Sequence, residues 1–376
     1  MKPRVLLPIL VAALFLAVAS AASAQIANPV QLYGHPMSCP DPDVANWGNN
    51  YFAACTSDYG QDNPEPRAQK MGSQPDAFPL YFSSDLQHWS FMNYVITPQD
   101  SSSASFPCIP PAGNWPGGEF WAPEIHKING WWTAFYGCQL KGSRKWVIAQ
   151  SWSKSLTSGN WGTKVLFNDP TAAGSIDPSI APDPQNPGYY DLVFMSFPAH
   201  IYIAEVAVNP GIHLVSTPKL ISQPTLAWEE GWEEGPVIWP QWPSPYTSVD
   251  DLFVNAASTW NNTYAIAIEQ AVNPLLDLWT KQSTPLMQGG NGLVSTGIGA
   301  QPFVGPGGQA DMTIAFHVQL GSATQNMEGR FLAFAHLGFH QVNGQWWPYV
   351  PGGVAPQSYS SLVSAAKLQQ ATNGAK

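Results

Sequence analysis

The chain has 376 residues, only 11% of them charged, and its formal charge of −10 argues against a nucleic-acid-binding protein, which needs a basic surface. A hydrophobic content of 44% excludes a wholly disordered chain. With 36 prolines, 32 glycines and 17 tryptophans, the composition favours short strands joined by turns over long helices, and it supplies indole faces on which flat apolar ligands can stack.

Residues 1–24 have the pattern of an export signal. Lys2 and Arg4 form a basic start, residues 5–18 are apolar, and residues 22–24 (ASA) form a small-residue cleavage site. Cleavage before Gln25 predicts a secreted or periplasmic protein that is not attached to a membrane. The alternative is that the same segment is retained as a membrane anchor, since it approaches spanning length.

Disulfides are possible in an exported protein, and there is no C-x-x-C pair of the kind found in zinc modules. The cysteines are Cys39, Cys55, Cys108 and Cys138. If residues 46–50 form a hairpin turn, Val44 pairs with Tyr51 and Cys39 lies almost opposite Cys55. This interpretation favours a Cys39–Cys55 disulfide and, by exclusion, Cys108–Cys138. The alternative is four buried free thiols.

A short pattern recurs along the chain: any residue, then proline, any residue and an aliphatic residue. Its copies are residues 41–44, 122–125, 177–180, 235–238 and 301–304. Each copy is followed by a turn and a second apolar run, and in most units by a third. Proline has no N–H to donate to a ladder, so it is expected where a strand begins.

Five such units predict an all-β, five-bladed β-propeller with a central, funnel-shaped active site. The blades are expected to begin near residues 39, 121, 175, 233 and 299, within a single domain spanning 25–376. The alternative is two unrelated β-sandwiches, but no linker or change in composition divides the chain.

The predicted strand starts bring carboxylates together. They are Asp41, Glu124, Asp177 and Glu234. Like charges raise one another's pKa, so gathering them in a chain with 11% charged residues indicates a function. Glu229, Glu230 and Glu233 compete with Glu234 for a catalytic role, but Glu234 alone directly precedes the Gly-Pro strand start, and the others are expected in a solvated or binding loop.

Three of these segments resemble motifs of glycoside hydrolase family 43: CPDPDV (39–44), SIDPSI (175–180) and EEGPVIW (233–239). FSSDLQHW (82–89), WAPEI (121–125) and NGQWWP (343–348) extend the resemblance over most of the chain. The resemblance implies a five-bladed propeller that cleaves arabinose or xylose linkages with inversion. It implies Asp41 as general base, Glu234 as general acid and Asp177 as the carboxylate that orients the acid and raises its pKa.

The residue types suit this chemistry, because inversion needs one protonated acid and one ionised base on opposite sides of the bond. We therefore expect an exported, inverting glycoside hydrolase that acts on arabinose- or xylose-containing plant polysaccharides or oligosaccharides, with arabinan or arabinofuranosides favoured. The alternatives are a β-xylosidase of the same family and a non-catalytic carbohydrate-binding propeller.

Five further residues are candidate substrate contacts. Trp121 and Trp232 offer indole faces beside the predicted channel, and Glu124 begins an inner strand. Arg330 is expected either to contact sugar hydroxyls or to form a surface ion pair. His35 is expected either to touch substrate or to belong to a capped loop.

No metal and no other cofactor is expected. Many members of the family carry a histidine at the start of the fifth blade, where it helps hold a central calcium ion. The corresponding segment here, residues 296–303, has Ile298 and Ala300 and no histidine, which places that calcium in doubt. The remaining histidines, His317 among them, are expected to be structural.

Overall fold

The computed structural model consists almost entirely of strands. It describes residues 28–33, 35–48, 50–57, 76–110, 119–157, 160–171, 173–183, 185–209, 211–239, 249–258, 263–289, 295–297, 302–304, 312–320 and 328–351. Its helices are α1 (Pro98–Ser101) and the 3-10 helix η2 (Ala227–Glu229). Within these ranges no helix has the length and apolar character needed to cross a bilayer. The expected signal segment 1–24 lies outside the described residues.

Four sheets are regular, because each begins with four antiparallel strands in chain order. The first contains β3 (Asp43–Trp47), β4 (Asn50–Ala54), β5 (Ala77–Ser83) and β6 (Trp89–Ile96). The second contains β7 (Phe120–Ile128), β8 (Trp131–Gln139), β9 (Trp146–Ser153) and β10 (Gly162–Phe167).

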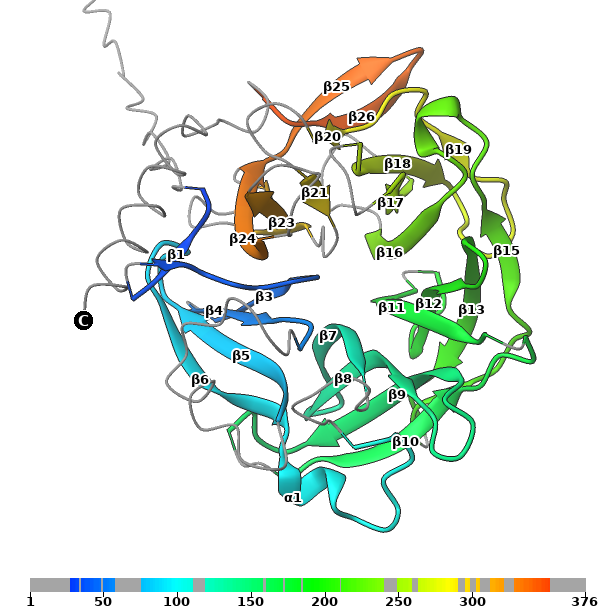
Figure 1. The fold of residues 1–376 in the computed structure, drawn as a ribbon. Coiled ribbons are helices and arrows are strands. Elements are labelled where there is room, and N and C mark those ends of the chain that lie inside the picture. Colours follow the sequence, from blue (N-terminus) through cyan, green and yellow to red (C-terminus); the bar gives the residue numbers. More distant parts are fainter. Residues whose placement is uncertain are drawn as a thin grey trace, which may run out of the picture.

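The third contains β11 (Ser175–Pro182), β12 (Tyr189–Ser196), β13 (His200–Ala207) and β14 (His213–Leu214), with β15 (Lys219–Ser222) also paired to β13. The fourth contains β16 (Glu233–Trp239), β17 (Asp250–Ala256), β18 (Ala265–Ala271) and β19 (Thr280–Lys281), with β20 (Met287–Gln288) also paired to β18. Figure 1 shows these sheets arranged around one centre, with β3, β7, β11 and β16 innermost. This is a propeller fold.

The last expected unit is built differently. It contains β21 (Ser295–Gly297), β22 (Pro302–Val304), β23 (Met312–Leu320) and β24 (Glu328–His336). β21 pairs with residues 317–319 of β23, and β22 pairs with residues 312–314 of the same strand. β24 pairs with residues 313–320 of β23. Among the described residues the structure therefore has four regular blades, and the expectation of a five-bladed propeller is wrong. The described residues of its inner side are the two short strands β21 and β22, and β22 begins at Pro302, which has no N–H to donate.

The start of the chain pairs with this last sheet. The Val30 N–H donates to the Leu332 carbonyl (2.9 Å), the Leu332 N–H donates to the Met37 carbonyl (2.9 Å), and the Cys39 N–H donates to the Arg330 carbonyl (2.8 Å). Residues from β23 and β24 are therefore held beside the segment that leads into β3. Two small ribbons complete the fold: β1 (Gln31–Leu32) with β2 (His35–Pro36), and β25 (Gly338–Val342) with β26 (Gln345–Tyr349).

The first hairpin differs in register from the expectation. Trp47 pairs with Asn50, so the loop is two residues long and Val44 lies opposite Ala53 rather than Tyr51. The structure nevertheless joins Cys39 to Cys55, and it joins Cys108 to Cys138.

Hydrophobic side chains fill the space between neighbouring sheets. One cluster combines Phe253 and Ile266 of the fourth sheet with Ile314 and Phe316 of β23, and all four side chains are fully buried. Because a blade packs against neighbours on both faces, β17 and β18 are buried along their whole length. This packing fixes the inner strands and the residues at their starts.

Candidate active site

The residues that precede proline at the four inner-strand starts share an unusual backbone conformation. Asp41, Ala122, Asp177 and Gly235 have φ angles of 47°, 47°, 56° and 53°. Positive φ is uncommon outside glycine, and a residue before proline normally prefers an extended conformation. Such strain persists where the surrounding structure over-determines it, often at functional sites.

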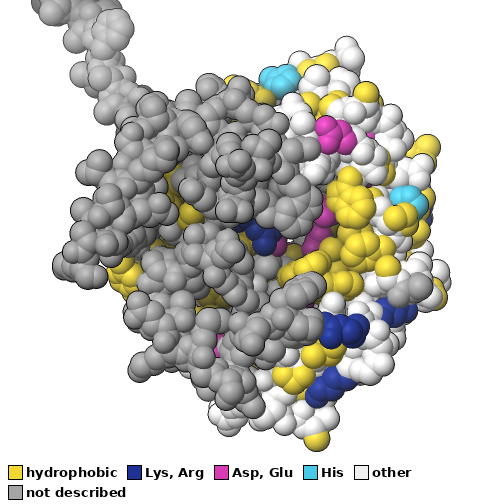
Figure 2. Space-filling view, in the orientation of Figure 1, with side chains coloured by type: hydrophobic (Ala, Val, Ile, Leu, Met, Phe, Trp, Pro, Cys, Tyr) yellow, Lys and Arg dark blue, Asp and Glu magenta, His cyan; other side chains and the backbone are white. Residues whose placement is uncertain are grey.

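A bulge accompanies this conformation in three of the sheets. The ladder register shifts between Trp121 and Glu124, between Ile176 and Ser179, and between Glu234 and Val237. An extra residue in one strand bends that strand and changes the direction of its side chains. Segments 41–43, 122–124, 177–178 and 235–237 consequently line one pocket at the meeting point of the four inner strands. Figure 2 shows basic and acidic side chains in a hollow near the centre, with hydrophobic side chains along one side.

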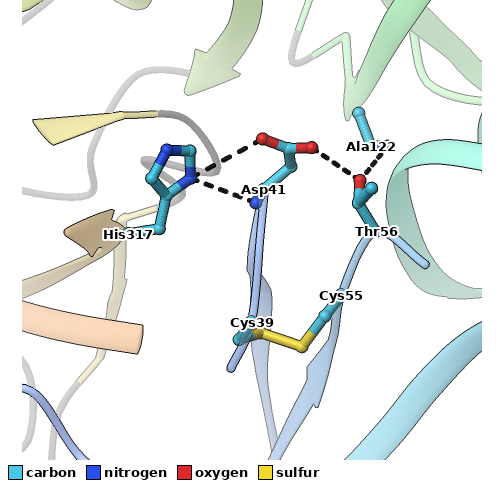
Figure 3. Close-up of a disulfide and its surroundings, with 6 residues drawn as sticks. All are labelled: Cys39, Asp41, Cys55, Thr56, Ala122 and His317. Carbon is cyan, nitrogen blue, oxygen red and sulfur yellow. Dashed lines mark hydrogen bonds and ion pairs between the residues drawn. A yellow bond between two sulfur atoms is a disulfide. The ribbon is translucent and has the colours of Figure 1, made fainter. Parts of the chain in front are cut away.

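Asp41 lies between the first and last sheets (Figure 3). The Thr56 hydroxyl donates to Asp41 Oδ2 (2.6 Å), and Arg330 Nη1 donates to Asp41 Oδ1 (3.0 Å). The Cys39–Cys55 disulfide joins the residues that lie two before Asp41 and one before Thr56. The carboxylate is therefore oriented by one donor from its own sheet and one from β24.

His317, on β23, approaches Asp41 from the other side (Figure 3). The Asp41 N–H donates to His317 Nδ1 (3.2 Å), and Asp41 Oδ1 lies 3.6 Å from the same nitrogen. Burial, then the nearby Arg330 guanidinium, lowers the pKa of His317 to about 3, with the Asp41 charge opposing. The imidazole is therefore neutral at physiological pH, with its proton on Nε2, for which the described part of the chain offers no hydrogen-bond acceptor.

Glu234 receives two hydrogen bonds. Trp232 Nε1 donates to Glu234 Oε2 (2.8 Å), and the Tyr264 hydroxyl donates to Glu234 Oε1 (2.7 Å). Burial raises the pKa of Glu234, and Asp41 raises it further, while the bonds from Trp232 and Tyr264 lower it. The net direction is upward, which favours a protonated carboxyl group.

Asp177 connects the other two carboxylates. It is buried, and its Oδ2 accepts a hydrogen bond from the Gly235 N–H (3.0 Å), directly after Glu234. Burial raises the pKa of Asp177 well above its ordinary value, and the charges of Glu234 and Asp41 raise it further. Asp41, Asp177 and Glu234 therefore form one electrostatically interacting group.

Glu124 lines the same pocket and takes part in a set of bonds between the inner strands. Asp43 Oδ2 accepts from the Ile125 N–H (2.6 Å), Glu124 Oε2 accepts from the Ile180 N–H (3.1 Å), and the Ser179 hydroxyl accepts from the Ile238 N–H (3.3 Å). Each bond joins one sheet to the next. Because Glu124 bonds Ile180 of the next sheet, its carboxylate stabilises the assembly of sheets. The same carboxylate also pairs with His126 on its own strand. A substrate contact by Glu124 stays a prediction.

The other candidate contacts have different surroundings. One face of Trp121 packs on Trp146, with ring centroids 4.1 Å apart. Trp232 bonds Glu234, and Arg330 forms an ion pair with Asp41 rather than with a group on the outer surface. The His35 backbone belongs to β2, and its side chain lies outside the described residues.

The sequence reading assigned no role in the site to Thr56, Tyr264 or His317. Tyr264 directly precedes β18, His317 lies on β23, and their rings stack with centroids 6.4 Å apart. No motif marks them, and their role becomes visible only when distant strands are brought together. Among the residues that the structure describes, no group of three or more histidine, cysteine or acidic side chains is arranged to hold a metal. Ile298 and Ala300 lie outside those residues, so the expected absence of a metal stays a prediction.

Comparison with known proteins identifies a family and several relatives. The family model of glycosyl hydrolases family 43 matches residues 26–336. An extracellular exo-α-(1→5)-L-arabinofuranosidase of Streptomyces avermitilis is 27% identical over 215 residues, covering 53% of this chain and 42% of that protein. An extracellular endo-α-(1→5)-L-arabinanase 1 of Bacillus subtilis is 26% identical over 233 residues, covering 60% of this chain and 67% of that protein.

A solved structure, a thermostable family-43 glycoside hydrolase, superposes with a TM-score of 0.66 at 21% identity. The match covers 88% of this chain and 98% of that one. At this identity the likeness shows the fold. The alignment with the Streptomyces enzyme spans less than half of that enzyme's length.

Proposed function

Because the chain belongs to glycosyl hydrolases family 43, we propose that it is an inverting O-glycoside hydrolase that cleaves arabinan or arabinofuranosides. The observation that carries the proposal is the interacting group of Asp41, Asp177 and Glu234: the first two line one pocket, and Glu234 directly precedes Gly235 of the same lining. The names of the Streptomyces and Bacillus relatives support arabinose-containing substrates and an extracellular location.

The surroundings of the three carboxylates support different roles. Burial favours the proton on Glu234, as a general acid requires, and Trp232 and Tyr264 hold both of its oxygens. Asp41 is oriented by Thr56 and Arg330 and is the proposed base that activates water. Asp177 is the proposed orienting carboxylate: it accepts from the Gly235 N–H beside the acid, and in its ionised form its charge would raise the pKa of the acid.

The proposal extends to the whole molecule. The active site would lie at the centre of the ring of sheets, and residues 25–376 would form the exported domain. The substrate would be a polysaccharide or an oligosaccharide. A β-xylosidase remains the second candidate, because the motifs around Asp41, Asp177 and Glu234 serve both linkages.

The proposal is tested by incubating the secreted protein with arabinan, an aryl α-L-arabinofuranoside and an aryl β-xyloside. We expect turnover of the first two and, in proton NMR spectra of the first product, an anomeric configuration opposite to that of the substrate. Inversion requires the two carboxyl groups to be about 6.5–9.5 Å apart, with water between them. A retained configuration contradicts the mechanism, and binding without turnover favours a non-catalytic carbohydrate-binding propeller.

Asp177→Asn tests the third carboxylate. Removing a repelling charge should lower the pKa of Glu234, so the acid loses its proton at lower pH. The alkaline limb of the activity profile should therefore move to lower pH. Activity on arabinan should fall more than activity on aryl glycosides with good leaving groups, which need little protonation. Steady-state rates across pH provide the measurement. Equal losses on both substrates with an unmoved profile would refute the modulator role.

A further inference from the structure

A buried group of three carboxylates surrounds one lysine at the start of β16. Lys281 Nζ, on β19, lies 2.8 Å from Glu229 Oε1 and 3.6 Å from Glu269 Oε1, and it also pairs with Glu233. The Glu229 and Glu233 side chains are 0% exposed. These two glutamates were expected in a solvated or binding loop. Their burial shows instead that they belong to an internal cluster.

This cluster has more negative than positive charge. The Ser222 hydroxyl, on β15, lies within hydrogen-bond distance of Glu233 Oε2 (2.8 Å) and Glu269 Oε1 (2.5 Å), and its single proton is donated to one of them at a time. Burial raises the pKa of Glu233 to about 7 even though the Lys281 charge lowers it. Removing one partner from such a site leaves buried charges without compensation. Lys281 is therefore the group on which the arrangement of the cluster depends.

The cluster is connected to the loop that leads to Glu234. Glu229 Oε2 accepts hydrogen bonds from the Thr225 and Leu226 N–H groups, both at 2.6 Å. These bonds fix the beginning of the 225–232 loop, and Glu233 fixes the point where the loop enters β16. Between these two anchors the loop carries Trp232, whose indole donates to Glu234 Oε2.

Neighbouring residues of a strand point to opposite faces, so Glu233 and Glu234 share one backbone segment but serve different sites. Glu233 points to Lys281, and Glu234 is held by Trp232 and Tyr264. A change at Lys281 can therefore reach Glu234 through the adjacent residue and through the indole. In Figure 1, β15, β18 and β19 lie on the outer side of β16.

We propose that Lys281 is a positioning residue for Glu234: by pairing with Glu229 and Glu233 it fixes the 225–232 loop and holds the Trp232 indole against the acid. The proposal rests on the proposed role of Glu234 as general acid. Lys281 itself does not touch substrate.

Lys281→Met should reduce kcat on arabinan roughly 10- to 100-fold, the size of loss that a displacement of about 1 Å produces. The loss should be smaller for aryl glycosides with good leaving groups, because those need less protonation. The Trp232 hydrogen bond lowers the pKa of Glu234, so loss of this bond should raise that pKa. Glu234 would then keep its proton to higher pH, and the alkaline limb of the activity profile should move to higher pH. Lys281→Arg should restore most of the activity.

Lys219→Met is the matched control. Lys219 Nζ contacts the carbonyl oxygens of Leu275 (2.9 Å) and Leu276 (3.1 Å) near the same strands, and it is exposed. Its replacement should leave rates and pH profile unchanged. A Lys281→Met loss that is equal for all leaving groups, with no shift of the alkaline limb, would overturn the proposal.

Hydrogen exchange followed by mass spectrometry tests the loop without any enzyme assay. Peptides covering 225–234 should exchange faster in Lys281→Met than in the unmodified protein or in Lys219→Met. Unchanged exchange overturns the positioning role, even if the protein proves to have no glycosidase activity. If Lys281→Met does not fold, Glu229→Gln serves in its place, because it removes one ion-pair partner and retains an acceptor for Thr225 and Leu226. Faster exchange of the same peptides is again expected, and unchanged exchange contradicts the proposal.

Discussion

Asp41→Asn should lower kcat/KM by roughly 10²- to 10⁴-fold, the usual contribution of a general base. The loss should be similar for arabinan and for aryl glycosides with good leaving groups, because activation of water is required whichever group departs. Asn keeps the size of the side chain and an oxygen for Thr56 or Arg330, so the fold should persist. Steady-state kinetics on both substrates provides the measurement.

Azide provides a second readout for this variant, since a small anionic nucleophile does not need a base. Added azide should restore part of the activity of Asp41→Asn on the aryl glycoside and should not stimulate the unmodified protein. Asp85→Asn, in the turn between β5 and β6, is the control and should retain full activity. A loss for Asp41→Asn that is confined to poor leaving groups would assign the acid role, rather than the base role, to Asp41.

Local sequence pattern was sufficient to locate the inner strands. Each proline pattern lies on or next to one inner strand: Pro42 directly precedes β3, whereas Pro123, Pro178 and Pro236 are each the fourth residue of β7, β11 and β16. These three prolines lie where the ladder register shifts, at a bulge, and not at the strand start that the missing N–H had predicted. The irregular last sheet could not be predicted, because the way β21 and β22 share one edge of β23 depends on pairing between strands rather than on local preference.

The site was predictable to the same extent. Asp41 and Asp177 stand at fixed positions in a repeated motif, so their convergence follows from the fold. The partners that set their properties come from distant strands: His317 and Arg330 reach Asp41 across 276 and 289 residues of sequence. Long-range contacts of this kind have no local signature. The same reason explains why a lysine on a two-residue strand, Lys281, gave no signal.

Glu234→Gln should reduce activity on arabinan by roughly 10²- to 10⁴-fold, because the leaving oxygen then has no proton donor. Aryl glycosides with good leaving groups should lose far less, since their phenolate departs without a proton. The alkaline limb should also disappear for these substrates. In the unmodified protein, activity falls as pH rises through the raised pKa of Glu234, whereas Gln has no proton to lose.

Glu230→Gln is the matched control for this prediction. Glu230 is exposed, lies four residues earlier in the same acidic loop and accepts a hydrogen bond from the Thr263 hydroxyl (3.0 Å). It should keep the rates and the pH profile of the unmodified protein, because its exposed carboxylate bonds the Thr263 hydroxyl and is not part of the group formed by Asp41, Asp177 and Glu234. If Glu230→Gln instead shows the loss that depends on the leaving group, and Glu234→Gln retains its alkaline limb, the general acid has been assigned to the wrong glutamate.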